Sequence, residues 1–180
     1  MRLRPFLPAG LFCLLAATAL RGADLPVHDV QGAGAESPRA GQVVSMTGVV
    51  TARRTNGFYL QAPDSATDAD PSTSEGVFVF TSSAPPSSAA VGNGVRVTGT
   101  VLEYRPSADP ASPPLTELGG SPTVALLSTG NALPSPVVLS AADLSPSTPF
   151  DRLERYEGMR VRVDDLLVVA PTGGTVDEAT

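Results

Sequence analysis

The sequences VSMTGVV (residues 44–50) and VRVTGTV (residues 95–101) share one pattern, and this pattern decides the fold. In both, apolar residues occupy every second position and a Thr-Gly pair fills the same place, at Gly48 and Gly99. Alternation with a period of two is typical of β-strands with one buried face. A glycine in the middle of a strand marks a bend or a bulge, as at the corner of a barrel. We therefore expect two long strands, each bent at its glycine.

The rest of the chain also favours strands. Its 18 prolines and 17 glycines divide it into short pieces, and no window of helix length carries a 3.6-residue apolar stripe. Further apolar runs lie at residues 57–61 (GFYLQ), 76–80 (GVFVF), 115–118 (LTEL), 123–128 (TVALLS) and 158–163 (GMRVRV). They recur at no fixed period, which excludes a repeat array. We predict an all-β fold, a small Greek-key barrel of the OB type with Pro/Ser-rich loops, and the main alternative is a β-sandwich.

The chain divides into five segments. We expect a signal peptide (1–23), an N-terminal arm (24–40), an OB-type barrel (41–128), a Pro-rich linker (129–152) and the start of a further β segment (153–180). The last segment stops soon after a Pro-Gly turn, so we expect the sequence to be a truncated piece of a longer protein.

Residues 1–23 have the three parts of a secretory signal peptide. Arg2 and Arg4 precede an uncharged apolar run, and small residues follow, which allows cleavage after Ala19 or Ala23. The alternative is a membrane anchor, but a membrane-spanning helix needs about 20 apolar residues and this run is shorter. We expect secretion to the periplasm or the exterior, with no membrane attachment after cleavage. The only cysteine, Cys13, lies inside this segment, so the mature chain has no disulfide.

The charge balance argues against nonspecific electrostatic binding of nucleic acid by the chain as a whole. Without its leader the chain keeps nine basic residues, all arginine, against 18 acidic residues. Such binding needs clustered positive charge. A local basic strip remains compatible with this balance.

One such strip is a candidate site for single-stranded nucleic acid. OB barrels bind single strands across strands two and three, where aromatic rings stack on bases and arginines follow phosphates. The candidates are Arg53, Arg54, Phe58, Tyr59 and Arg105. Because Phe58 and Tyr59 are adjacent in a strand, they point to opposite faces and only one can meet a base. The alternative is that the arginines are solvated loop charges and the aromatic rings are core residues.

An acidic loop is a candidate calcium site. Asp64, Asp68, Asp70 and Glu75 lie within twelve residues of one another, and Ca²⁺ takes oxygen ligands of this kind. The alternative is a solvated acidic loop without an ion. His28 is the only histidine, and without a second one to pair with we interpret it as a surface residue.

Several segments in their order along the chain carry a resemblance to a known family. The segments are HDVQGAGAESP (28–38), GQVVSMTGVVTA (41–52), GFYLQ, DADPSTSEGVFVF (68–80), VGNGVRVTGTVLEY (91–104), LTEL and LERYEGMRVRV (153–163). Together they resemble the OB-fold region that precedes the catalytic domain in secreted bacterial nucleases of the endonuclease/exonuclease/phosphatase superfamily. The resemblance covers roughly residues 27–179. It implies an exported DNA- or RNA-degrading enzyme whose C-terminal catalytic domain uses a divalent cation such as Mg²⁺.

These 180 residues carry no catalytic constellation of their own. We find no Ser-His-Asp arrangement and no phosphate-binding glycine loop, and a single histidine cannot form a pair. We therefore expect the non-catalytic N-terminal region of a secreted nuclease, which assists nucleic-acid binding or positions the catalytic domain. One alternative is a free-standing secreted OB module that binds a sugar, a peptide or a surface partner. Another is a structural spacer stabilised by calcium.

Overall fold

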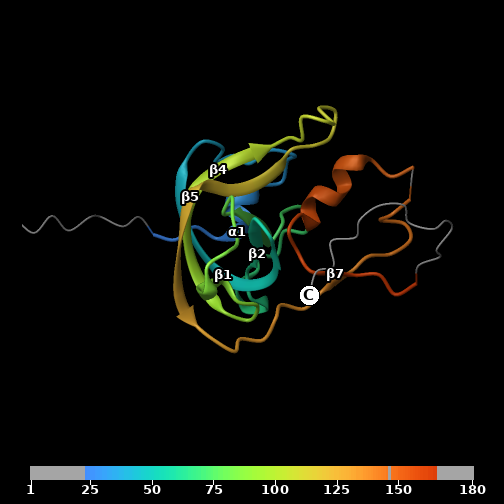
Figure 1. Ribbon diagram of the computed structural model, residues 1–180. Coiled ribbons are helices and arrows are strands. Elements are labelled where there is room, and N and C mark those ends of the chain that lie inside the picture. Colours follow the sequence, from blue (N-terminus) through green and yellow to red (C-terminus); the bar gives the residue numbers. More distant parts are fainter. Residues whose placement is uncertain (1–22, 146, 166–180) are drawn as a thin grey trace, which may run out of the picture.

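A computed structural model describes residues 23–145 and 147–165, and its centre is a closed five-stranded β-barrel (Figure 1). The barrel strands are β1 (Val43–Arg54), β2 (Gly57–Gln61), β3 (Gly76–Phe80), β4 (Gly94–Tyr104) and β5 (Leu115–Ser128). The other elements are helix α1 (Val27–Gln31), the short strands β6 (Val137–Val138) and β7 (Val161–Arg162), and the 3₁₀ helices η1 (Asp64–Ala66), η2 (Ser87–Ala89) and η3 (Phe150–Tyr156). None of the helices in this part of the chain is long and apolar enough for a membrane crossing. The expected signal peptide lies outside the described residues, apart from Ala23.

The strand order confirms the all-β, OB-type prediction. Around the barrel the order is β1-β2-β3-β5-β4, and β4 closes the ring by pairing with β1. All neighbouring pairs are antiparallel except β3 and β5, where Phe78 lies opposite Glu117 in a parallel pair. Five strands in this Greek-key order form an OB barrel, and the closed ring rules out the sandwich alternative.

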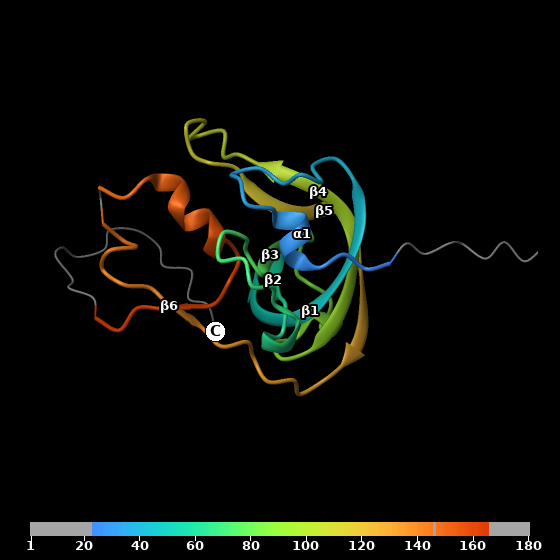
Figure 2. The same ribbon diagram turned by 180° about the vertical axis from the view of Figure 1, so that it is seen from behind.

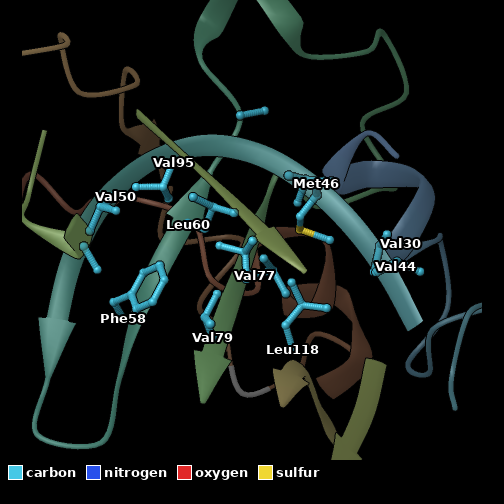
Figure 3. Packing of buried hydrophobic residues seen from close by; sticks show 14 of the residues in the cluster. Val30, Val44, Met46, Val50, Phe58, Leu60, Val77, Val79, Val95 and Leu118 are labelled. Atoms are coloured by element: carbon cyan, nitrogen blue, oxygen red, sulfur yellow. The ribbon is translucent and has the colours of Figure 1, made fainter. Parts of the chain in front are cut away.

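The two glycines of the repeated pattern serve different purposes. β1 pairs with β4 from Val43 to Val49 and with β2 from Val49 onward, so Gly48 lies where the strand changes partners. A Cβ atom at Gly48 would lie 2.7 Å from the carbonyl oxygen of Gln61 and 2.9 Å from Cγ of Leu60. Gly99 instead lies at a register shift between Thr98 and Thr100 in the β4–β5 ladder. Figure 3 shows β1 as a continuous arc around the core.

The core consists of one alternate set of residues from each strand (Figure 3). It includes Val44, Met46 and Val50 of β1, Phe58 and Leu60 of β2, Val77 and Val79 of β3, Val95, Val97 and Val101 of β4, and Leu118 of β5. Full burial of each such side chain stabilises the fold by roughly 1.5–3 kcal/mol. The segments expected as separate runs at 115–118 and 123–128 form the single strand β5, which continues through Gly119 and Gly120.

Helix α1 is part of this core although its segment was expected to be an arm. Val27, Val30 and Gln31 lie on one helical face and are buried, and both valines belong to the core cluster. Gln31 Nε2 donates a 2.5 Å hydrogen bond to the carbonyl oxygen of Gly76, at the start of β3. Figure 2 shows α1 lying against the barrel. The helix is short, and its stability comes from this packing.

The segment after β5 returns to the barrel and packs beside it (Figures 1 and 2). Ser74 Oγ donates a 2.6 Å hydrogen bond to the carbonyl oxygen of Glu157, and the backbone N–H of Arg160 donates to Gln61 Oε1 at 2.9 Å. The strand expected at 158–163 is limited to β7, which pairs in parallel with β6. The reason is local: Gly158 turns the chain with φ +70°, and residues 153–156 belong to η3.

Glu157 joins three parts of the molecule. Its Oε1 accepts hydrogen bonds from Gln31 Nε2 of α1 (3.3 Å) and from the backbone N–H of Thr116 in β5 (3.1 Å). Burial raises the pKa of Glu157 to about 8, and the carboxylate of Glu154 adds to this rise. The two donors lower the pKa only in part. The C-terminal segment is therefore held by a carboxyl group that favours its protonated form.

We predict that Gly48→Val lowers the free energy of unfolding by more than about 1 kcal/mol, the full range of strand propensities. The reason is that the new side chain would collide with the backbone of Gln61. Urea unfolding followed by circular dichroism measures this change. Gly34→Ala is the matched control, because a Cβ atom at Gly34 would lie 3.8 Å from its nearest neighbour, the carbonyl oxygen of Glu36. This substitution should change the free energy of unfolding by less than about 0.5 kcal/mol. Equal stability of the two variants would contradict a steric role for Gly48.

We also predict that stability falls as pH rises from 4.5 to 8. The pKa of Glu157 is about 8 in the folded protein against an ordinary value of 4.5, so the folded state holds more protons in this range. The resulting slope is at most about 1.4 kcal/mol per pH unit. Glu157→Gln should flatten it, whereas Glu36→Gln, at an exposed carboxylate, should not. Urea unfolding at pH 5, 7 and 9 measures the slope, and the same slope in the Glu157→Gln variant would refute the assignment.

Candidate functional site

The outer face of β2 and β3 carries a pair of aromatic rings. Phe58 and Leu60 point into the core, so Tyr59 points outward from β2. Tyr59 lies directly opposite Phe78 of β3, and their ring centroids are 5.1 Å apart at an interplanar angle of 53°. OB barrels bind single strands on this face, and aromatic rings there stack on bases.

The two neighbouring arginines of β1 point in different directions. The ladder with β2 shifts register between Val50 and Ala52, and Arg54 then pairs with Gly57 on the side of the sheet that Tyr59 shares. The ring of Phe78 lies against Gly57, where a Cβ atom would collide with it. Arg53 instead donates a 2.8 Å hydrogen bond to the carbonyl oxygen of Pro85, in the loop between β3 and β4. Exposed Arg54 therefore lies beside the aromatic pair, and Arg53 does not.

Two other candidates lie away from this face. Phe58 is 0% exposed and belongs to the core, so it cannot stack on a base (Figure 3). Arg105 lies beyond the end of β4, in the loop that enters β5 near the start of β3, whereas Arg54 lies at the far end of β3. Arg105 bonds to Glu36 at 3.2 Å and to the carbonyl oxygen of Ser112 at 2.5 Å. The groups that remain open to a ligand are Arg54 and Tyr59, whereas Phe78 is 5% exposed and packs behind the Tyr59 ring.

A carboxyl group borders the aromatic pair and limits what the face can bind. Glu117 of β5 lies opposite Phe78 and is 5% exposed. Burial raises the pKa of Glu117. When ionised, this carboxylate repels a phosphate brought close to Phe78. A polyanion would therefore approach from the Arg54 end of the face.

The structure separates the four acidic residues expected to bind calcium. Asp64 accepts hydrogen bonds from Ser135, from its Oγ at 2.7 Å and its backbone N–H at 2.9 Å, and these bonds lower the pKa of Asp64. Asp70 accepts corresponding bonds from Ser72 at 2.6 and 2.9 Å, which lower the pKa of Asp70. Asp70 thus serves its own loop, whereas Asp64 ties the loop to the segment after β5. The expected set of four calcium ligands is not assembled.

Asp68 and Glu75 instead meet His28 of α1. The Nδ1 atom of His28 lies 3.0 Å from Glu75 Oε1 and 3.8 Å from Asp68 Oδ2. The three side chains offer one donor atom each within 4.8 Å of one another. The interpretation of His28 as a surface residue is wrong, because its side chain is only 15% exposed. Docking of α1 against β3 brings His28 to the loop, and no local sequence pattern reveals this.

Comparison with known proteins adds no family to these observations. No protein-family model matches the chain, and no curated protein matches it either. The resemblance to the OB-fold region of secreted nucleases therefore stays a prediction from the sequence.

Proposed function

We propose that this chain is the non-catalytic OB-type region of a secreted nuclease and gives that enzyme a weak contact with single-stranded nucleic acid. The observation that carries the proposal is the pair of Arg54 and Tyr59 on the outer face of β2, with the Tyr59 ring supported from β3 by buried Phe78. An arginine beside a partly exposed tyrosine ring can pair with a phosphate while that ring stacks on the neighbouring base. This is the face that OB barrels use for oligonucleotides.

The contact is weak for reasons of charge. One arginine neutralises one phosphate, and the salt dependence for a single strand is then shallow, with a log-log slope of about −0.7. Stacking on one base contributes roughly 1–3 kcal/mol. Glu117 beside Phe78 and an excess of acidic residues over the whole chain both oppose a polyanion. The barrel therefore guides a strand and does not hold it tightly.

Cleavage belongs to another part of the proposed enzyme. The resemblance implies an exported enzyme with a C-terminal catalytic domain that holds a divalent cation such as Mg²⁺, and residues 1–23 have the pattern of the signal peptide that secretion requires. In that arrangement the barrel positions the substrate or the catalytic domain. Its non-catalytic role agrees with a sequence that has a single histidine and no nucleophile–base pair.

Fluorescence anisotropy with a labelled single-stranded oligonucleotide at low salt tests the contact. We expect Tyr59→Ala to weaken binding by roughly 5- to 150-fold, the equivalent of one stacked base. We expect Arg54→Ala to weaken it and to remove the salt dependence. Arg53→Ala and Arg105→Ala are matched controls that should bind like the wild type, since both side chains are bonded elsewhere.

Three outcomes would contradict the contact. They are no binding at low salt, unchanged binding in both Arg54→Ala and Tyr59→Ala, and a loss confined to the Arg53→Ala or Arg105→Ala variant. Binding of a neutral oligosaccharide that is lost in Tyr59→Ala, without any binding of the oligonucleotide, would instead favour a free-standing sugar-binding module.

We further predict that the purified chain does not cleave plasmid DNA in the presence of Mg²⁺, Mn²⁺ or Ca²⁺. The reason is that its sequence lacks the set of Asn, Asp, Glu and His residues that the superfamily assembles in a separate α/β domain. Agarose-gel analysis of supercoiled plasmid measures this. Metal-dependent nicking that co-elutes with the folded protein would place catalytic groups within these residues.

A further inference from the structure

We propose that His28, Asp68 and Glu75 form a binding site for a divalent transition-metal cation, best matched by Zn²⁺, which fastens α1 to the loop between β2 and β3. The site is separate from the proposed contact with nucleic acid. It combines three converging side chains, donor atoms at suitable spacing and an unpartnered buried oxygen.

Each side chain is held in place before any ion arrives. His28 belongs to α1, whose neighbouring residues Val27 and Val30 are fixed in the core. Glu75 lies directly before β3, and its carbonyl oxygen accepts a 2.9 Å hydrogen bond from the backbone N–H of Ala62 that closes the loop. The backbone N–H of Asp68 donates to Glu75 Oε1 at 2.7 Å. The packing of α1 in the core and the start of β3 therefore position the site residues.

The spacing of the donor atoms fits a small tetrahedral ion. Zinc with nitrogen and oxygen ligands at about 2.1 Å places neighbouring donors about 3.4 Å apart. The two distances from His28 Nδ1, 3.0 Å to Glu75 Oε1 and 3.8 Å to Asp68 Oδ2, lie on either side of that value. Small rotations of the side chains would bring all three donors to one ion. For Nδ1 to bind the metal, the imidazole must carry its proton on Nε2.

Glu75 provides a second and independent observation. This residue is 5% exposed, and its Oε2 atom is buried without a hydrogen-bond partner among the described residues. A buried carboxylate oxygen without a partner is costly, and buried charges are normally paired or bound to a metal. A cation at this cluster would compensate the charge of Glu75 and of Asp68 together.

The donor set favours zinc over calcium. Calcium takes six to eight oxygen ligands, whereas this cluster offers one imidazole nitrogen and two carboxylates. Imidazole suits zinc and its neighbours among the first-row metals. The two other acidic residues of the loop, Asp64 and Asp70, are bonded to serines. The Asp68 side chain is 29% exposed, which leaves a path for the ion and a fourth position for water.

Isothermal titration of the metal-stripped, purified chain with Zn²⁺ tests the proposal. We expect one Zn²⁺ per chain, a higher melting temperature with zinc, and a visible absorption band when Co²⁺ replaces it. Asp68→Asn and His28→Gln should each weaken Zn²⁺ binding by at least about 100-fold, because loss of an outer-shell partner alone costs roughly 10- to 100-fold. Asp68 lies on the loop surface, so its substitution leaves the core intact.

Asp64→Asn and Asp70→Asn are matched controls, since they remove carboxylates of the same loop that lie outside the cluster. Both should bind Zn²⁺ like the wild type. The proposal is overturned if the wild-type chain binds no Zn²⁺ in the titration. It is also overturned if both Asp68→Asn and His28→Gln, shown by circular dichroism to be folded, bind Zn²⁺ with unchanged affinity. A third outcome would also overturn it and would favour the calcium site of carboxylate oxygens expected from the sequence. In that outcome the chain binds no zinc, and its Ca²⁺ binding is lost in Asp64→Asn and kept in His28→Gln.

Discussion

The structure depends on one constraint, the need for β1 to pair with two different strands. Its first half completes the ladder with β4 and its second half begins the ladder with β2, so the strand must curve around the core. That curvature requires close approach at Gly48, where no side chain fits beside Gln61 and Leu60. The closed ring sets the positions of the other four barrel strands. It also places Tyr59 on the outer face of β2, in contact with the buried ring of Phe78 in β3.

The segments before and after the barrel pack against it and are positioned by it. Val27 and Val30 complete the core from α1, and this packing places His28 beside Glu75. On the C-terminal side, Glu157 bonds both to α1 and to β5. The segments before and after the barrel are therefore joined through the same few polar side chains. The two proposed sites use different parts of this arrangement. The nucleic-acid contact lies on the outer face of the sheet, and the metal site lies where α1 meets the loop between β2 and β3.

The fold could be predicted from the sequence because its main signals are local. Alternation and mid-strand glycines at Gly48 and Gly99 depend on neighbouring residues only, and they sufficed for the barrel. The site residues depend on contacts between distant segments, such as that of His28 with Glu75, and on the register shift after Val50 that separates Arg53 from Arg54. Helix α1 has five residues, too few for a periodic signal. Tyr59 was a candidate from the sequence alone, but its partner Phe78 was missed, because only the register of β2 with β3 places the two rings opposite each other.

The parallel pairing of β3 with β5 has a consequence for how the chain folds. Parallel neighbours cannot be joined by a tight turn, and here β4 lies between them in sequence. The contact of Phe78 with Glu117 therefore closes a long loop, and long-range closures of this kind slow folding. Until β5 has joined, β3 and β4 each keep a free edge with unpaired N–H and C=O groups. Such edges pair readily with other chains, so the barrel is protected from aggregation only when its last strand is in place.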